Sequence, residues 1–222
     1  MKNLLLLAAL IYGTGALAQD CKNYYFLQNN KTIEMSIYGK KGDVTAKQVY
    51  TVSDVKSSGG STTATVNSEM FDKKGKSMAK STSMMKCTGG ALMVDMKMMM
   101  PQQQQQQIAQ ARIEEAFIEY PANMKAGDAL KDAAISVDMN TSGMPGHLTM
   151  NLTERKIEAK ESVTTTAGTW DCFKITYKGK INMKMAGIGI PMNVDGTEWY
   201  APGFGVVKSE SKHGGTAITS IK

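Results

Sequence analysis

Apolar and polar residues alternate along most of this chain, and this alternation constrains the fold more than any other feature of the sequence. In residues 33–37 every second residue is apolar, and residues 49–55 are rich in β-branched side chains. A Gly-Gly-Ser break at residues 59–61 precedes residues 62–71, where the alternation resumes. A period of two places alternate side chains on opposite faces of a strand, so the sequence predicts a series of β-strands separated by turns.

Two predicted turns have nearly identical sequences, and both are typical of β-hairpins. Residues 38–42 read YGKKG and residues 71–75 read FDKKG. In each, an aromatic residue ends a strand, two lysines follow, and a glycine stands where the turn needs the left-handed backbone conformation. Residues 212–215, KHGG, predict a third hairpin of the same kind. We therefore expect a chain of consecutive hairpins.

Further strands are expected along the rest of the chain, and one segment is expected to be helical. Pro101 can occupy the first position of a helix, and residues 102–111, which begin with six glutamines, contain no helix breaker. Residues 113–120 fit a helix or a strand, and a strand is favoured. The other predicted strands are residues 91–98, 134–139, 147–152, 155–163, 170–185 and 191–199, with residues 206–221 folded as a pair.

This pattern of elements predicts the fold class. About a dozen strands with one or two short helices indicate an all-β or mostly β protein, built as a curved antiparallel sheet or open half-barrel from consecutive hairpins. No convincing linker divides residues 19–222, so a single β-rich domain is expected.

The first 18 residues have the features of a signal peptide. Lys2 precedes an apolar run at residues 4–11, and residues 16–18, Ala-Leu-Ala, fit the site at which a signal peptidase cleaves. The apolar run is too short to cross the hydrocarbon core of a bilayer. Asp20 precedes Cys21, whereas a lipid-modified cysteine needs a small residue before it. We therefore expect the peptide to be removed and the chain to be exported, periplasmic or secreted, with no transmembrane segment after cleavage.

Three cysteines follow the expected cleavage site: Cys21, Cys87 and Cys172. Because exported chains meet an oxidising compartment, one disulfide and one free thiol are expected. Cys172 alternates with Trp170 in a predicted strand, a position that suits a small buried hydrophobic residue. A disulfide between Cys21 and Cys87 is therefore favoured among the three possible pairings, and it would tie the N-terminus of the mature chain to the sheet.

Charge and motif content argue against several classes of function. The formal net charge is +6, but the lysines are scattered instead of forming a run, which does not favour binding of nucleic acid. The two histidines, His147 and His213, lie in separate predicted elements. The sequence lacks a metalloprotease helix motif, a Cys-x-x-Cys pair and a phosphate-binding glycine loop. No pattern pairs a nucleophile with a base, so we expect a protein that is not an enzyme and has no cofactor.

The 18 methionines are the most unusual feature of the composition, and two interpretations of them compete. In the first, their unbranched and polarisable side chains line the core or a cavity for an apolar ligand. The ligand-binding residues expected on this interpretation are Met96, Met98, Met100, Met183 and Met185. Residues 101–111 would then act as a lid. A solid interior near these methionines would instead favour a structural protein with a filled core.

In the second interpretation, thioethers bind Cu(I), a soft cation that prefers sulfur. Met144, His147 and Met150 offer two thioethers and an imidazole within seven residues. If His147 begins a strand, Met150 lies on its opposite face, which counts against one compact site. The other candidate set is Met96, Met98 and Met100, which would share one face of a strand.

Three segments of the chain together resemble a known family. They are QDCKNYY at residues 19–25, ESVTTTAGTWDCFKI at residues 161–175 and EWYAPGFGVVKSE at residues 198–210. They resemble the TapB-like group of exported bacterial proteins, whose core is a domain of unknown function. The resemblance implies a location in the bacterial envelope and a fold similar to the open half-barrel of LolA-like lipoprotein carriers, and it brings no catalytic residues. This chain departs from the family pattern in its glutamine tract and in Trp170, where phenylalanine is usual.

These expectations define three candidate functions. The first is a non-enzymatic binding module or carrier that holds a lipid or other apolar ligand in a concavity of the sheet. The second is a structural or interaction protein with a filled core, which would contact another envelope protein through exposed hairpin edges. The third, copper binding, is a minor alternative that needs the methionine and histidine side chains to converge.

Overall fold

Residues 21–99, 116–141, 144–185 and 188–222 are described in the computed structural model of the chain. Within these residues the backbone forms thirteen β-strands and three short 3-10 helices. The 3-10 helices are η1 (Cys21–Asn23), η2 (Tyr25–Leu27) and η3 (Met96–Met99). The strands are β1 (Thr32–Gly39), β2 (Val44–Ser58), β3 (Ser61–Asp72), β4 (Ser77–Thr88), β5 (Ala91–Asp95), β6 (Phe117–Tyr120), β7 (Ala133–Thr141), β8 (Met144–Thr165), β9 (Gly168–Met185), β10 (Ile188–Asn193), β11 (Gly196–Ala201), β12 (Gly205–Ser211) and β13 (Gly214–Ile221).

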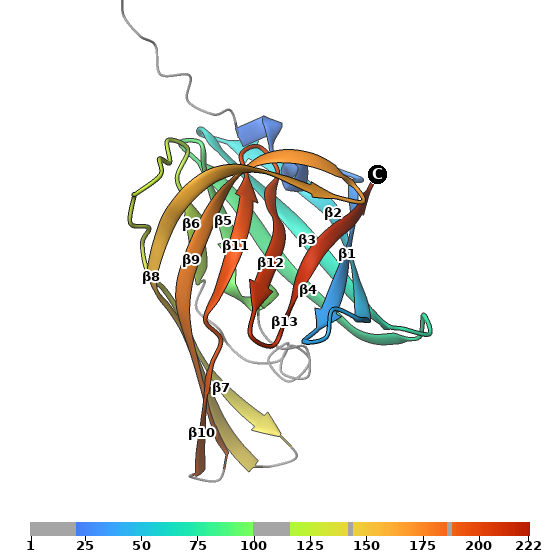
Figure 1. Ribbon diagram of the computed structural model, residues 1–222, viewed down its shortest axis with the longest axis vertical. Coiled ribbons are helices and arrows are strands. Elements are labelled where there is room, and N and C mark those ends of the chain that lie inside the picture. The colour runs from blue at the N-terminus through green and yellow to red at the C-terminus, as the bar shows by residue number, and fades with distance from the viewer. Residues whose placement is uncertain (1–20, 100–115, 142–143, 186–187) are drawn as a thin grey trace, which may run out of the picture.

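The described strands form one antiparallel sheet, whose order is β6-β5-β4-β3-β2-β1-β13-β12-β11-β9-β8-β7, with β10 paired to β9. The sheet curves until it is nearly closed into a barrel (Figure 1). The predicted all-β class and curved antiparallel sheet are thus confirmed. The wall continues past a half-barrel because β1 pairs with β13, which joins the N-terminal and C-terminal hairpins of the chain.

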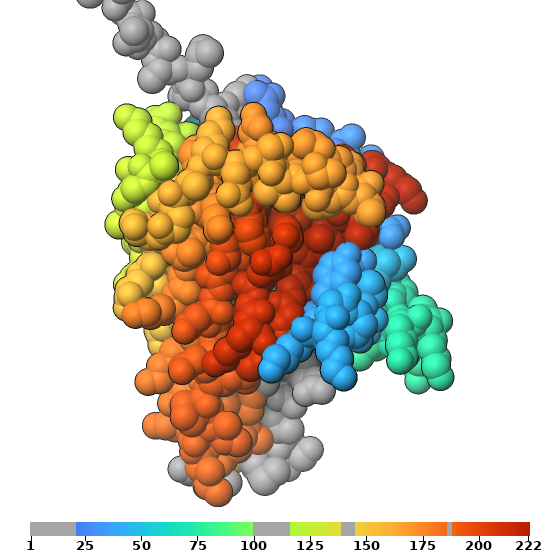
Figure 2. Space-filling model, in the orientation of Figure 1, coloured from blue at the N-terminus to red at the C-terminus, as the bar shows by residue number. Residues whose placement is uncertain are grey.

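The hairpin of β8 and β9 has the longest strands of the described sheet. Its far part, together with β7 and β10, extends beyond the barrel (Figure 1), and Figure 2 shows this extension as a narrow projection. Residues 147–152 and 155–163, predicted as two strands, belong to the single strand β8. A bulge at Glu154, whose φ is 50°, bends this strand without ending it. Conversely, residues 191–199, predicted as one strand, are divided between β10 and β11.

The hairpin turns predicted at Gly42 and Gly75 are present. Gly42 lies between β1 and β2 with a φ of 81°, and Gly75 lies between β3 and β4 with a φ of 82°. The amide of Gly42 donates to the carbonyl of Gly39, and the amide of Gly75 donates to the carbonyl of Asp72, both at 2.9 Å. The two similar sequences therefore form the same turn, because glycine adopts a positive φ without the strain that a side chain would add.

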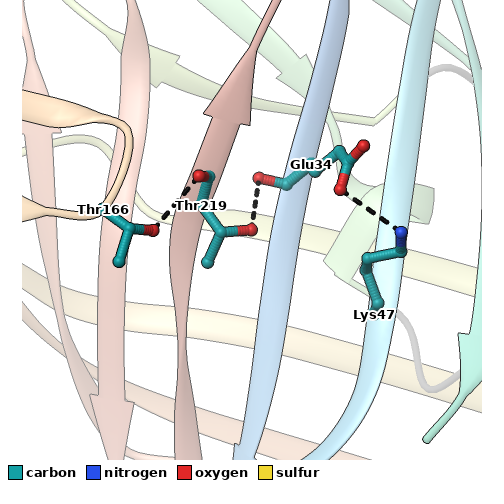
Figure 3. Close-up of polar contacts among 4 residues, drawn as sticks. All are labelled: Glu34, Lys47, Thr166 and Thr219. Atoms are coloured by element: carbon teal, nitrogen blue, oxygen red, sulfur yellow. Dashed lines mark hydrogen bonds and ion pairs between the residues drawn. The ribbon is translucent and has the colours of Figure 1, made fainter.

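Hydrogen bonds donated by two threonine hydroxyls link the turn of the β8–β9 hairpin to β13, and β13 to β1 (Figure 3). The hydroxyl of Thr166 donates to the carbonyl of Thr219 on β13 at 3.1 Å, and the hydroxyl of Thr219 donates to the carbonyl of Glu34 on β1 at 3.4 Å. The carboxylate of Glu34 pairs with the ammonium of Lys47 on β2 at 3.3 Å. The long hairpin is thereby linked to neighbouring strands that lie far from it in the sequence.

The N-terminal segment is attached to the barrel by a disulfide and by aromatic contacts. The disulfide joins Cys21 in η1 to Cys87 in β4, which is the pairing that the sequence favours. Phe26 in η2 packs edge-on against Tyr50 and Phe204, with ring centroids 6.0 and 5.7 Å apart. All five side chains are buried, so η1 and η2 form part of the hydrophobic core.

The remaining cysteine, Cys172, is free and fully buried. Burial raises the pKa of its thiol to about 12, so almost none of it is thiolate at about pH 8. We expect Ellman's reagent at this pH to detect no reactive thiol in the folded protein and one thiol per chain in urea. Rapid reaction of the folded protein would show that Cys172 is accessible, and three thiols in urea would show that Cys21 and Cys87 are not bonded.

Two expectations fall on residues outside the described part of the chain. These are the signal peptide, residues 1–18, and the helical lid, residues 101–111. Among the residues that are described, none of the helices has the length and apolar content needed to cross a bilayer.

Candidate ligand-binding cavity

A cavity of about 360 Å³ lies inside the barrel. Residues of β1–β6, β9 and β11–β13, together with η2 and η3, form its wall. Most of these residues are apolar because alternate side chains of each strand point inward. On β1, for example, Met35 and Ile37 line the cavity, whereas Ser36 between them does not. The alternation that predicts the strands is therefore also what makes the interior apolar.

Five of the described methionines line this cavity: Met35, Met70, Met85, Met98 and Met99. They come from β1, β3, β4 and η3, so thioether side chains enter the wall from several parts of the barrel. Methionine has an unbranched, rotatable side chain with a polarisable sulfur atom. A wall rich in such side chains can adapt to apolar ligands of different shapes.

The methionines predicted to bind a ligand lie in several different places. Met98 lines the cavity. Met96 is fully buried in the core, and Met183 packs against the core from β9. Met185 is partly buried on β9 and is not among the residues that line the cavity. Met100 lies outside the described residues.

Met96 and Met98 do not share a strand face, because the strand predicted at residues 91–98 ends early. β5 stops at Asp95, and η3 begins with the next residue. Oδ1 of Asp95 accepts a hydrogen bond from the backbone amide of Lys97 at 2.9 Å, and Oδ2 pairs with Nζ of Lys97 at 3.0 Å. An aspartate that bonds to the backbone two residues ahead favours a turn over a continuing strand. The expectation of a common strand face is therefore wrong.

The structure also separates residues predicted to bind copper. His147 is half-exposed on β8, where its Nδ1 lies 2.7 Å from Oδ1 of Asp138 on β7. Met150 is buried in the core on the opposite face of β8. The side chain of Met144 lies outside the described part of the chain, as does Met100 of the other candidate set. Within the described ranges, no group of three or more His, Cys, Asp or Glu residues could hold a metal ion.

A buried polar cluster forms one part of the cavity wall. Glu198 on β11 and Tyr120 on β6 both line the cavity, and both are almost completely buried. The hydroxyl of Tyr120 donates to Oε1 of Glu198 at 3.0 Å. Nη2 of Arg155, on β8, lies 3.6 Å from the same oxygen. One oxygen of the carboxylate therefore contacts both the phenol and the guanidinium.

Arg155 also connects the two ends of the sheet. Its Nη1 donates to the backbone carbonyl of Glu119 in β6 at 3.1 Å and to that of Lys131, just before β7, at 2.9 Å. β6 and β7 are the first and last strands in the order of the sheet, so the guanidinium lies at the seam where the barrel nearly closes. Its central carbon is 5.0 Å from the centroid of the Tyr120 ring, which adds a cation–π contact.

Tyrosines extend this cluster through the core. The ring of Tyr120 stacks on that of Tyr200, with centroids 4.5 Å apart. The hydroxyl of Tyr200 donates to the hydroxyl of Tyr24 at 3.1 Å, and Tyr24 donates to the carbonyl of Gly90 at 3.1 Å. Each phenol of this series has a hydrogen-bond partner, as buried polar groups require. The cavity wall is thus connected to the N-terminal segment that carries the disulfide.

Burial controls the charge of the groups in the cavity wall. Desolvation raises the pKa of Glu198, while the guanidinium of Arg155 and the hydrogen bond from Tyr120 oppose this rise. Burial and the nearby charge of Glu198 raise the pKa of Tyr120 and of Tyr177, so both phenols are neutral at physiological pH. An arginine keeps its proton, so the ionised state of Glu198 is the one in which this buried pair carries no net charge.

Sequence analysis did not identify Arg155, Glu198 or Tyr120 as members of a site. Arg155 stands in the run Glu154-Arg155-Lys156, which has the composition of an exposed strand face. A signal was nevertheless present, because only two of the 26 Lys and Arg residues are arginine. A guanidinium makes several directed hydrogen bonds at once, which an ammonium does not, so a rare arginine in a lysine-rich chain indicates a specific position.

The fold and the cavity define the class of protein: a nearly closed antiparallel β-barrel with a mainly apolar cavity inside. Two solved structures have a similar fold. A candidate exported protein with a YmcC-like fold from Bacteroides fragilis is 21% identical to this chain, with a TM-score of 0.70 over 88% of this chain and 96% of that one. A candidate lipoprotein from Parabacteroides distasonis is 22% identical, with a TM-score of 0.72 over 89% of this chain and 98% of that one.

Residues 28–221 match the DUF3108-like family, and the chain belongs to this family. No curated protein matches the chain. At 21% and 22% identity, the two solved structures show a common fold and no more. The finer resemblances, to the TapB-like group and to LolA-like carriers, stay predictions.

Proposed function

We propose that this protein binds an apolar ligand in the barrel cavity and acts in the bacterial envelope as a non-enzymatic binding protein or carrier. The observation that carries the proposal is the cavity of about 360 Å³ with its mainly apolar lining. Protein interiors are densely packed and contain few voids larger than a water molecule. Pockets that bind small molecules have volumes of about 300–1,000 Å³. The interior of this barrel therefore suits a ligand better than it suits a filled core.

Three observations support the envelope location. Residues 1–18 have the pattern of a signal peptide. The two structural neighbours are a candidate exported protein and a candidate lipoprotein. The disulfide between Cys21 and Cys87 fits an oxidising compartment, where such bonds persist. The resemblance to TapB-like exported proteins and LolA-like carriers points to the same location.

The proposal assigns no catalysis to the protein. The described residues closest to a catalytic arrangement are Ser136, His147 and Asp138, in which Nε2 of His147 lies 3.4 Å from Oγ of Ser136 and Nδ1 lies 2.7 Å from Asp138. The side chain of Asp138 is 93% exposed. Hydrolysis by such a triad needs a substrate pocket and oxyanion donors beside the nucleophile. Among the described side chains that line the cavity, none belongs to β7 or β8, the strands that carry these three residues.

Native mass spectrometry tests the proposal directly, on protein purified gently from an exported preparation. Excess mass in the lipid range would support the proposal and identify the class of ligand. A bare polypeptide mass, together with no uptake of added apolar probes, would contradict it.

Filling the cavity is expected to weaken binding. Val206 on β12 is half-buried and lines the cavity, so Val206→Trp places a large ring in the space a ligand would occupy. We expect this variant to bind the fluorescent probe N-phenylnaphthylamine at least about tenfold more weakly, equivalent to roughly 1.4 kcal/mol. Fluorescence titration measures the affinity, with Val44→Trp at an exposed position of β2 as the control. Wild-type affinity in a folded Val206→Trp protein would contradict binding in the cavity.

Protein interaction is the second candidate function, and the exposed residues of β10 favour it. Among the described strands, β10 pairs with β9 alone, and its residues Ile188 and Ile190 are 71% and 63% exposed. An exposed apolar edge strand can pair with a strand of another protein. If this alternative holds, native mass spectra will show complexes with another protein. The double variant Ile188→Lys with Ile190→Lys is expected to abolish these complexes, and Val206→Trp is expected to retain them.

A further inference from the structure

The polar groups of the cavity wall include a carboxylate oxygen and a phenol for which no hydrogen bond to another described residue is seen. Oε1 of Glu198 contacts Tyr120 and Arg155, but Oε2 accepts no hydrogen bond from any described group. The hydroxyl of Tyr177, on β9, likewise has no partner within the described chain. Both Glu198 and Tyr177 line the cavity. A ligand in the cavity can therefore reach a carboxylate oxygen and a phenol.

These two groups lie in the same part of the wall. Tyr177 on β9 pairs with Gly196 on β11, two residues before Glu198, so both side chains lie on the face of the sheet that borders the cavity. The phenol is thus a neutral donor beside an acceptor. A donor or acceptor that faces the cavity without a protein partner is available to a ligand, and a ligand that bonds to both groups gains affinity. The matching ligand has a donor and an acceptor at one end and an apolar remainder.

The guanidinium of Arg155 does not offer a site for an anion. Arg155 is 1% exposed and is not among the residues that line the cavity. Its Nη1 donates to the carbonyls of Glu119 and Lys131. Its Nη2 has no hydrogen-bond partner among the described residues, but it lies 3.6 Å from Oε1 of Glu198, whose charge balances that of the guanidinium. The ionisable group that faces the cavity from this ion pair is therefore the carboxylate.

The charge of the ion pair determines which head groups the cavity accepts. An anionic head would meet the negative charge of Glu198, and a cationic head would leave the buried cluster with a net positive charge. Both are unfavourable where little water is present to solvate the charge. An uncharged hydroxyl incurs neither cost, and it is both a donor and an acceptor.

Building on the proposed function, we infer that the cavity selects an uncharged amphiphile with a hydroxyl head and an aliphatic tail. The head donates its hydrogen to Oε2 of Glu198, and its oxygen accepts the hydrogen of Tyr177. The tail lies against the apolar wall that Met35, Met70 and Met85 help to form. The ligand class is that of long-chain alcohols and acylglycerols, not of fatty acid anions or amines.

A competition experiment with three ligands of equal tail length tests this selectivity. Decanol, decanoate and decylamine share one alkyl chain, so differences among them report on the head group. Each is titrated against the full chain loaded with N-phenylnaphthylamine. Decanol is expected to displace the probe at a concentration at least about tenfold lower than either charged compound, because it buries no unpaired charge.

Two variants connect the selectivity to the named residues. Tyr177→Phe removes the donor alone. It is expected to weaken the binding of decanol about three- to tenfold, the effect of one hydrogen bond, and to change the affinity for decanoate little. Tyr38→Phe is the matched control, because Tyr38 is a half-buried tyrosine outside the cavity lining. Glu198→Gln leaves the charge of Arg155 unbalanced and is expected to shift the preference towards decanoate. If this second variant does not fold, Tyr177→Phe still decides the question.

The outcomes separate this inference from the proposed function. Equal or better displacement by decanoate or decylamine, or wild-type affinity for decanol in Tyr177→Phe, would overturn the inference and leave cavity binding intact. If neither the probe nor any of the three decyl compounds binds, the proposed function itself fails. A preference for decanol that Tyr177→Phe reduces and Tyr38→Phe retains would support both.

Discussion

Replacing Arg155 by methionine is expected to lower the free energy of unfolding by about 3–5 kcal/mol. The substitution leaves the carboxylate of Glu198, which is 3% exposed, without its counter-charge. It also removes the hydrogen bonds to the carbonyls of Glu119 and Lys131, which connect the two ends of the sheet. Methionine has a similar length to the arginine stem, so the loss reports mainly on charge and hydrogen bonding. Equilibrium unfolding in urea measures it.

The matched control for this variant is Lys178→Met. Lys178 also pairs with a glutamate, Glu154, at 2.8 Å, but both side chains are well exposed. Water solvates that pair, so the unfolding curve of the control is expected to change little. The double variant Arg155→Met with Glu198→Gln should recover part of the lost stability, because no buried charge is left unpaired. If it is as unstable as the single variant, the charge explanation is wrong.

The effect of Arg155→Met is also expected to depend on pH. Burial raises the pKa of Glu198, and Arg155 opposes that rise, so the pKa of this carboxyl is higher still in the variant. A carboxyl whose pKa is higher in the folded than in the unfolded chain holds its proton more tightly when folded. The stability of the variant therefore falls as the pH rises above the ordinary carboxyl range. Its deficit relative to the wild type should be smaller at about pH 5 than at about pH 8.

Removal of the disulfide is expected to have an effect of comparable size. Replacing Cys21 and Cys87 together by serine should lower the free energy of unfolding by about 2–5 kcal/mol. The two residues are 66 positions apart, and closing a loop of that length restricts the unfolded chain by roughly 4 kcal/mol on the chain-entropy view. Loss of the bond also frees the N-terminal segment that carries Phe26 and Tyr24 into the core.

The disulfide prediction is checked by urea unfolding of the oxidised protein, the reduced protein and the double serine variant. Reduced wild type and the variant should unfold at similar, lower urea concentrations. Cys172→Ala serves as control, because it removes a buried thiol without touching the disulfide, and it should cost about 1 kcal/mol. Identical unfolding of oxidised and reduced protein would show that the bond does not stabilise the fold.

Several local features of this barrel were accessible from the sequence because they depend on a few neighbouring residues. The alternation in residues 33–37 and 62–71 specifies strands whatever they pair with. The glycines of the two Lys-Lys-Gly turns specify where the chain reverses, since other residues avoid a positive φ. The preference for pairing Cys21 with Cys87 came from the predicted strand position of Cys172, and the structure has this disulfide with Cys172 free and buried.

The binding residues were harder to predict, because the same residue type has different surroundings at different positions. Met35 and Met96 are both methionines in or beside predicted strands, yet Met35 lines the cavity and Met96 is fully buried in the core. The difference arises at Asp95, whose contacts with Lys97 favour the end of β5 and the start of η3 at this point. Alternation shows that a strand has two faces, but it does not show which face borders an empty space.

From its sequence alone, this protein was determined to be a chain of antiparallel hairpins with an apolar face, tied by one disulfide and preceded by a predicted signal peptide. Only the tertiary structure decided that β1 pairs with β13, that the sheet nearly closes, and that Arg155 and Glu198 meet at the seam beside a cavity. The physical reason is distance along the chain. Turns and strands follow from preferences within a few residues, whereas closure, burial of a charge and an internal cavity depend on contacts between distant segments and on the curvature of the whole sheet.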